Sequence, residues 1–214
     1  MICKCPRGAN LPIVPKQNCP VNFGQIQRAA FQRLYKSDGT KNQMTLPELK
    51  ATWEELLTSY DDSLVVLTPI LYSPTMTAGD VLTSGGGNDS PDGIEEVEGY
   101  NPTTFTATVK KANQKEVIKP LKDLMCEEIG VVLFDGWGQM RLIDTGDVDT
   151  EGNPYYEFIP ITAFGVSDVT SGIFGASDFN TIQWSFYPNW SDNTVILKAS
   201  DFFPVRDLIP VVEN

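Results

Sequence analysis

The residues able to do acid–base, nucleophilic or metal chemistry are few in this chain, and their types restrict what chemistry is possible. The 214 residues include no histidine, so neither a Ser-His-Asp triad nor a histidine-ligated metal can form. The carboxylates of Glu95 and Glu96, and those of Glu127 and Glu128, are adjacent in sequence. Adjacent side chains diverge on a strand and on a helix, which does not suit a paired acid and base. We therefore expect no catalytic residues and no cofactor, and the chain is predicted not to be an enzyme.

Two glycine- and acid-containing segments resemble ion or phosphate sites only in part. Asp147–Gly152 begins like a calcium loop, but the twelfth position is Phe158 instead of an acid, so a hairpin turn is favoured over a calcium site. Gly85, Gly86 and Gly87 could cradle a phosphate, but acidic residues follow them and no lysine does. A glycine hinge for an acidic loop is the better interpretation.

The four cysteines favour neither a disulfide framework nor a metal site. Cys3 and Cys5 form C-x-C, whereas common zinc sites use C-x-x-C together with further cysteines or histidines. Cys19 and Cys126 are too unevenly placed to complete a set. Thiols packed under the N-terminal segment are the expected state, and no metal is predicted.

Charge is divided by position along the chain. Residues 1–50 hold eight basic residues against two acids, a net charge of +6, whereas the rest holds eight basic and 26 acidic residues, a net charge of −18. A basic arm on an acidic body predicts head-to-tail association between copies. The acidic body should repel nucleic acid, because binding requires cations that neutralise phosphates. The basic residues of the first segment are Lys4, Arg7, Lys16, Arg28, Arg33, Lys36, Lys41 and Lys50.

The sequence predicts a soluble protein made in a cytosol. No apolar run approaches the roughly 18 residues that a membrane span needs. The start, MICKCPRGAN, has a basic residue but no apolar core. We therefore expect no membrane partner.

The N-terminal quarter is predicted to contain an arm and one helix. Residues 1–44 are assigned to an extended arm and linker, within which FGQIQRAAFQRLYK (residues 23–36) fits helix or strand equally well. A helix is expected from Thr45 to Tyr60, because Thr45 can cap it, Pro47 suits its first turn and Glu48 completes a capping box. Residues 45–214 are assigned to one β-rich domain.

The middle of the chain is predicted to hold a long loop between strands. Ser63–Leu71 indicates a buried strand interrupted by Pro69. Residues 73–102 are poor in apolar residues and rich in glycine and acids, which predicts a long irregular loop. Thr103–Lys111 alternates cleanly as a strand should. A second helix follows around Lys115–Glu127, with Pro120 bending it or marking its beginning.

The second half predicts a mainly β (α+β) fold. GVVLFD and QMRLID flank an Asp-Gly-Trp-Gly turn at residues 135–138, and further strands follow at short intervals. We expect a small β-barrel or sandwich with one flanking helix, a second N-terminal helix, and a long extended arm and loop.

Two surface interpretations stay open. The lysines of residues 110–122 are expected to meet acids on the same chain or on a neighbouring copy, because no aromatic residues interleave with them as in single-strand binders. Trp184, Tyr187 and Trp190 could form a sugar platform. The alternation of Ile182, Trp184 and Phe186 favours a core strand instead.

The order of elements over residues 64–200 resembles the major tail tube proteins of long-tailed bacteriophages. TFTATVKK leads into the helix around Lys115–Glu127, GGGNDSPDGIEEVEG (Gly85–Gly99) lies where that family has a long loop, and IPITAF with TIQWSFYP resembles its closing strands. The cysteine-bearing arm and the helix at Thr45–Tyr60 depart from the family pattern.

This resemblance implies a virion structural protein, assembled in the host cytoplasm and located in the tail. Its partners would be copies of itself in stacked, hexameric rings and neighbouring virion proteins, with DNA passing without specific binding. Another neck, collar or capsid-decorating protein and a carbohydrate-binding β-sandwich are the alternatives. The residues expected to contact adjacent subunits or rings are Lys4, Arg7, Lys16, Gly85, Gly86, Gly87, Asp89, Asp92, Glu95 and Glu96.

Overall fold

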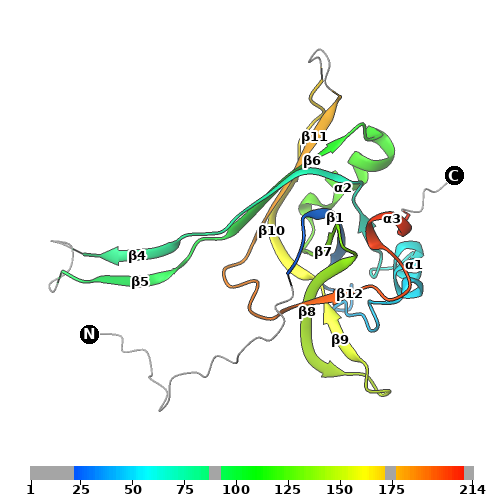
Figure 1. Cartoon of the computed structure of the whole chain (residues 1–214), viewed down its shortest axis with the longest axis horizontal. Coiled ribbons are helices and arrows are strands. Elements are labelled where there is room, and N and C mark those ends of the chain that lie inside the picture. The colour runs from blue at the N-terminus through cyan, green and yellow to red at the C-terminus, as the bar shows by residue number, and fades with distance from the viewer. Residues whose placement is uncertain (1–21, 87–92, 172–176, 210–214) are drawn as a thin grey trace.

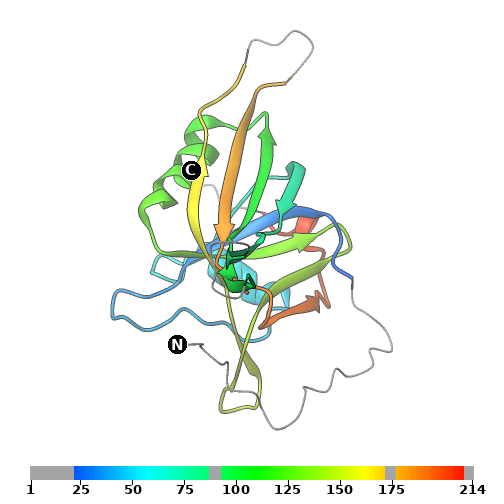
Figure 2. The ribbon, with the colours of Figure 1, turned by 90° about the vertical axis from the view of Figure 1, so that its left-hand side faces the viewer.

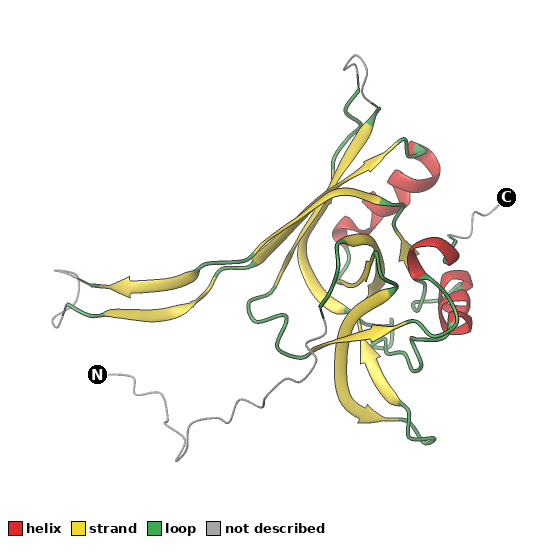
Figure 3. Ribbon diagram, viewed as in Figure 1, coloured by secondary structure: helices red, strands yellow, loops and turns green. Residues whose placement is uncertain are grey.

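The computed structural model describes residues 22–86, 93–171 and 177–209. Within these residues the chain is mainly β, as predicted, with strands outnumbering helices (Figure 1, Figure 3). The strands lie in one ten-stranded antiparallel sheet and one separate two-stranded sheet. The larger sheet follows the order β12-β8-β7-β10-β11-β6-β3. Outside this order, β1 pairs with both β7 and β2, and β9 pairs with β8.

Of the two expected forms, a small β-barrel or a sandwich, the closed barrel is not formed. The end strands of the path, β12 (Thr194–Lys198) and β3 (Leu71–Thr77), pair with β8 and β6 respectively and not with each other. β3 contains Pro74, which lacks an N–H to donate, and its register with β6 shifts between Tyr72 and Thr75. A proline-containing, irregular strand suits a sheet edge, so the sheet stays open.

Strands β1 (Ile26–Arg33) and β7 (Ile129–Asp135) form the wall between two hydrophobic clusters. They pair along the whole length of β7, from Arg33 opposite Ile129 to Ile26 opposite Asp135. Every residue of β7 is buried, because its side chains alternate between the two clusters. This explains why IGVVLFD is a continuous apolar run instead of an alternating one.

The first cluster lies between β1, β7 and β10 on one side and β6 and β11 on the other, and α2 with its flanking turns closes it. It includes Phe31, whose ring meets the Trp184 ring edge-on at 5.4 Å, and Phe105, whose ring stacks on Trp184 at 4.0 Å. The strands are β6 (Thr103–Lys110), β10 (Ile159–Val166) and β11 (Phe179–Phe186). The predicted alternation of β6 is confirmed.

The predicted flanking helix is confirmed, with a change of geometry at Pro120. A π-helical turn (η2, Gln114–Ile118) precedes α2 (Lys119–Asp123) and a 3₁₀ turn (η3, Leu124–Cys126) follows it. Asn113 caps the start by accepting the N–H groups of Lys115 and Glu116. Pro120 is the second residue of α2. Because it has no N–H, it cannot continue the π-helical bonding in which the Lys119 N–H donates to the Gln114 carbonyl.

The second cluster lies on the other face of β1 and β7. It is covered by α1 (Lys50–Thr58), β2 (Val66–Leu67) and the C-terminal helix α3 (Pro204–Asp207), and it includes residues of β8 (Gln139–Val148). The Trp53 ring of α1 meets the Phe134 ring of β7 at 5.2 Å. The β7–β8 hairpin predicted around residues 135–138 is confirmed.

The N-terminal helix is shorter than predicted, and the capping box is wrong. Leu46 has φ 52°, which lies outside the helical region, and α1 begins only at Lys50. The side chain that accepts the first helical N–H belongs to Asp201, whose Oδ1 lies 2.9 Å from the Lys50 nitrogen. A partner 151 residues away therefore determines where this helix starts.

Residues 22–44, which the sequence assigned to the arm and linker, lie in the same body. They contain β1, and Met44 exchanges two backbone hydrogen bonds, of 2.9 and 2.8 Å, with Tyr156 of β9 (Pro154–Glu157). Strand is thus the observed form of the segment that fitted helix or strand equally well. The preceding part of the predicted arm lies outside the described residues.

Candidate functional site

The predicted loop at residues 73–102 contains the end of β3 and the two strands of a β-ribbon, so the irregular-loop prediction is wrong. β4 (Val81–Gly85) and β5 (Glu95–Tyr100) pair antiparallel and extend the β3–β6 pair away from the body (Figure 1). The ribbon is the second, separate sheet. Turned by 90°, the ribbon comes toward the viewer with α1 behind it (Figure 2), so ribbon and helix lie at opposite sides of the body.

One face of the ribbon carries three large apolar side chains, and the Gly85–Glu95 pair continues this face at its outer end. Val81 lies opposite Tyr100 and Thr83 lies opposite Val97, and paired residues of neighbouring strands share a face. All of these side chains except that of Thr83 are large and apolar, and each is exposed to solvent, with Val97 at 64%. The other face presents Leu82, Ser84 and Glu96.

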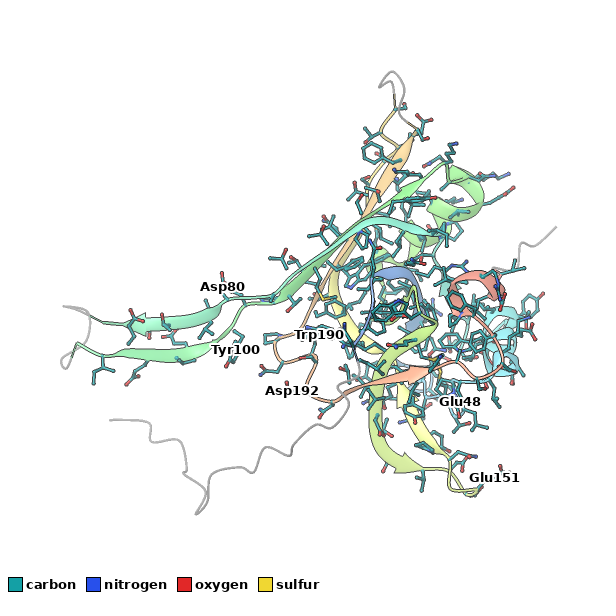
Figure 4. All side chains as sticks on the ribbon, viewed as in Figure 1. Glu48, Asp80, Tyr100, Glu151, Trp190 and Asp192 are labelled. Carbon is teal, nitrogen blue, oxygen red and sulfur yellow. The ribbon has the colours of Figure 1, made fainter. Side chains whose placement is uncertain are left out.

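The base of the ribbon depends on a close crossing of two backbones. A Cβ built on Gly79 would lie 1.8 Å from the carbonyl oxygen of Asn101, so only glycine fits there. The Asn101 N–H donates to the Asp80 carbonyl oxygen at 2.9 Å. Figure 4 labels Asp80 and Tyr100 at this junction, where the strands leave the body. The crossing fixes the direction in which the ribbon projects.

The structure places four of the predicted contact residues at the outer end of this ribbon. Gly85 and Gly86 have φ of 82° and 92°, and Gly85 pairs with Glu95 while Ser84 pairs with Glu96. The remaining residues predicted for this loop, Gly87, Asp89 and Asp92, lie outside the described residues.

The described ribbon residues carry negative charge only. Asp80, Glu95, Glu96 and Glu98 lie on the ribbon or at its base, and no lysine or arginine lies between residues 80 and 100. The apolar stripe therefore runs beside carboxylates. A surface that covers this ribbon should combine apolar area with cations.

The basic N-terminal segment is neutralised within the chain more than its sequence indicates. Arg33 binds Glu127 and Asp62, which raises the pKa of the guanidinium. Lys41 binds Glu157 at 3.0 Å, and this bond raises the lysine pKa. Lys50 binds Glu54 at 2.8 Å. These three cations meet carboxylates of their own chain, while Lys4, Arg7 and Lys16 lie outside the described residues.

Arg28 is the buried cation of this segment. Its Nε donates to the Thr68 carbonyl at 2.9 Å, and its Nη1 donates to the Val205 and Leu208 carbonyls at 3.1 and 2.6 Å. Burial lowers its pKa from 12.5 to about 10. Arg28 thus joins β1 to the C-terminal helix and is not free for a partner.

The lysines around α2 divide between the same chain and open surface. Lys122 pairs with Asp168, and the Lys110 ammonium lies 4.8 Å from the centre of the Tyr72 ring. Lys111, Lys115 and Lys119 are exposed and form no ion pair with another described residue. The last three are available to acids on another molecule.

One of the three aromatic residues of the possible sugar platform is not on the surface. Trp184 is 1% exposed and packs in the core, as the favoured alternative predicted. Trp190 stacks on Phe186 at 4.3 Å with 21° between the ring planes. Tyr187 stays exposed. Trp184, Tyr187 and Trp190 therefore do not form a platform of three exposed rings.

The calcium-like segment forms the turn between β8 and β9, as predicted. Asp149 Oδ1 accepts the N–H groups of Glu151 and Asn153, both at 2.8 Å. Hydrogen bonds from Asn153 hold the pKa of Asp149 below its ordinary value. Across the described ranges, no three acidic or cysteine side chains are grouped so that they could hold a metal ion.

Two further results concern the whole described chain. None of its helices has both the length and the apolar character needed to cross a membrane. Comparisons with protein-family models, curated proteins and solved structures found no match to this chain.

Sequence reasoning missed Val81, Val97 and Tyr100 as surface residues. The signal was present as two short segments, VLTSG and EEVEGY, on either side of a glycine-rich turn. The acids between the apolar residues hid the pattern, because a strand with two solvated faces need not alternate.

Proposed function

We propose that this chain is a virion structural protein that assembles with its own copies into stacked rings, forming the tail tube of a long-tailed bacteriophage. The observation that supports this most is the exposed, apolar-striped β4–β5 ribbon projecting from the body (Figure 3). A two-stranded ribbon without other support is only marginally stable in water. Contact with another molecule would stabilise it.

The ribbon has enough apolar surface to contribute to association. Burying an exposed aliphatic side chain contributes about 1.5–3 kcal/mol, and Val81, Val97 and Leu82 are all exposed. Exposed apolar stripes bordered by polar residues mark protein interaction sites. An enzyme or a glycan-binding module would not need such an element.

The position of the ribbon suits rings. It projects from one side of the body, so its contact with any part of a second copy other than the same ribbon joins two different surfaces. Such heterologous contacts produce closed rings when the rotation closes and filaments when it does not. Hexameric rings, their stacking and their joining to neighbouring virion proteins follow from the family resemblance.

The charge of the chain is compatible with passage of DNA. With a net charge of −12 and no histidine, the assembled wall would not bind phosphates, because binding needs cations to replace the counterions of DNA. DNA would pass without specific binding. We therefore propose the virion tail as the location of the protein, after assembly in the host cytoplasm.

Negative-stain electron microscopy of the purified full chain, at low ionic strength and high concentration, tests the proposal. We expect hollow filaments of uniform width that become shorter as salt screens the charged part of the contact. Discrete rings that never stack would favour the neck, collar or capsid-decorating alternative. A monomer under all of these conditions would overturn the proposal.

A further inference from the structure

A large apolar groove lies on the side of the body away from the ribbon. Its volume is about 1040 Å³, and it lies between the end of α1, the segment that includes β2, the start of α2 and the helix α3. Its floor includes Leu57, Val65 and Leu67, which belong to the second hydrophobic cluster. Figures 1 and 3 show the helices that border it gathered at the side opposite the ribbon.

The rim of the groove consists of exposed apolar side chains. Tyr60 is 91% exposed and Ile209 is 73% exposed, and Leu64 and Ile70 are partly exposed, at 42% and 39%. Tyr60, Leu64 and Ile70 belong to one stretch of the chain, and Ile209, far away in sequence, meets them around the same groove. An apolar patch of this kind on a single chain indicates an interaction surface.

The charge of the groove lining is nearly balanced, and two lysines lie beside it. The lining holds two cations, Arg28 and Arg206, and three acids, Asp61, Glu116 and Asp207. Arg206 pairs with Asp207. Lys115 and Lys119 are exposed and directly precede the lining residues Glu116 and Pro120, so the cations open to an acidic occupant lie at this edge of the groove.

We propose that this groove receives the β4–β5 ribbon of the next copy. The inference rests on the proposed self-assembly and names the surface that completes it. The apolar face formed by Val81, Val97 and Tyr100 would cover the groove, and the ribbon carboxylates would lie near Lys115 and Lys119. Five to six strand residues span about 16–20 Å, enough to cross such a groove.

The arrangement explains two separate observations with one contact. Among the described residues, the apolar stripe of the ribbon and the apolar rim of the groove are both exposed to solvent, on opposite sides of the same chain. Because one copy offers both surfaces, each subunit can donate a ribbon and accept another. This head-to-tail contact continues around a ring without any second protein.

Disulfide cross-linking between two variants tests the contact directly. In a background in which Cys3, Cys5, Cys19 and Cys126 are replaced by serine, one variant has Val97→Cys on the ribbon and the other has Ile70→Cys at the groove. After mild oxidation of the mixture, we expect about tenfold more covalent heterodimer than in the control, because docking raises the local thiol concentration. The control pairs Ile70→Cys with Val148→Cys, since Val148 is equally exposed, at 61%.

The outcomes separate this inference from the proposed function. Filaments with the expected heterodimer support both. Filaments in which the two pairs cross-link equally overturn the groove as the docking site and leave self-assembly standing, with the N-terminal segment or another surface as the occupant.

A second variant is used if the cysteine-free chain stays monomeric while the native chain assembles. In that case the substitution Ile70→Asp is made in the native chain. This variant must lose filaments if the inference is correct, and a fully assembling Ile70→Asp chain overturns it. A native chain that never assembles contradicts the proposed function itself.

Discussion

Strands β7 and β5 make the same kind of antiparallel pairing in opposite environments. β7 is buried at all seven positions and separates two hydrophobic clusters. β5 pairs only with β4, and five of its six residues are exposed. Regular strand geometry is therefore no measure of how much a segment contributes to the stability of the isolated chain. The body contains both hydrophobic clusters, whereas the ribbon exposes its apolar side chains, which is the basis for our proposal that it contacts another copy.

The largest expected difference between the two strands is in thermodynamic stability. Phe134→Ala on β7 should lower the free energy of unfolding by about 3–5 kcal/mol, because it leaves a cavity against Trp53. Val97→Ala on β5 should change it by no more than about 0.5 kcal/mol. Urea denaturation at low protein concentration measures both. Equal losses would show that the ribbon belongs to the folded core.

A smaller effect is expected at the end of β7. The buried carboxylate of Asp135 accepts the N–H groups of Gly24, Trp137 and Gln139 at 2.7, 2.9 and 2.8 Å. Asp135→Asn turns an amide NH₂ group toward at least one of these donors, which should cost about 1–3 kcal/mol. The same denaturation experiment checks this value. A neutral substitution would mean that the turn does not depend on these bonds.

The cap of α1 should contribute still less. Asp201→Ala removes the acceptor of the Lys50 N–H and should cost about 1 kcal/mol. Asp192→Ala, in the loop before β12 (Figure 4), is the matched control and should change stability by no more than about 0.5 kcal/mol. If both variants lose the same stability, the helix start does not need Asp201.

Acid should weaken the body through two surface carboxylates. Hydrogen bonds from the hydroxyls of Ser59 and Ser63 lower the pKa of Asp61 from 3.8 to about 2. A hydrogen bond from the Arg206 side chain likewise lowers the pKa of Asp207 to about 2. A lowered folded-state pKa stabilises the fold above pH 3.8 and loses that effect as the pH falls toward 2. Thermal unfolding across this window should therefore show a smaller drop for Asp61→Asn than for the native chain, and an identical drop would contradict the assignment.

The sequence predicted the parts of the fold that depend on local pattern. Alternation marked β6 at Phe105 and Ala107, and the Asp-Gly-Trp-Gly segment marked the β7–β8 turn, because both are decided by neighbours along the chain. The start of α1 was not predictable in this way. Its N–H partner is Asp201, and nothing near Thr45 indicates that residue.

The candidate site was predictable in position but not in form. Gly85, Gly86, Glu95 and Glu96 were predicted to be contact residues and lie at the outer end of the ribbon, yet the segment was expected to be irregular. Strand pairing between residues 81–85 and 95–100 does not depend on a buried face, so no periodicity shows it. The groove was beyond sequence reasoning, because Tyr60, Ile70 and Ile209 come together only through the fold. The sequence shows that residues 1–50 are basic and the rest acidic. It does not show that Arg33, Lys41 and Lys50 bind acids of their own chain.

The central claim is that the projecting ribbon joins copies of the chain, and two matched glycine substitutions test it most directly. Gly79→Ala places a methyl group against the Asn101 backbone and must redirect the ribbon, whereas Gly99→Ala adds the same methyl group where nothing lies within 4 Å. Sedimentation velocity should show that the Gly99→Ala chain assembles like the native one, while the Gly79→Ala chain stays small with an unchanged unfolding midpoint. Full assembly of the Gly79→Ala chain would contradict the account.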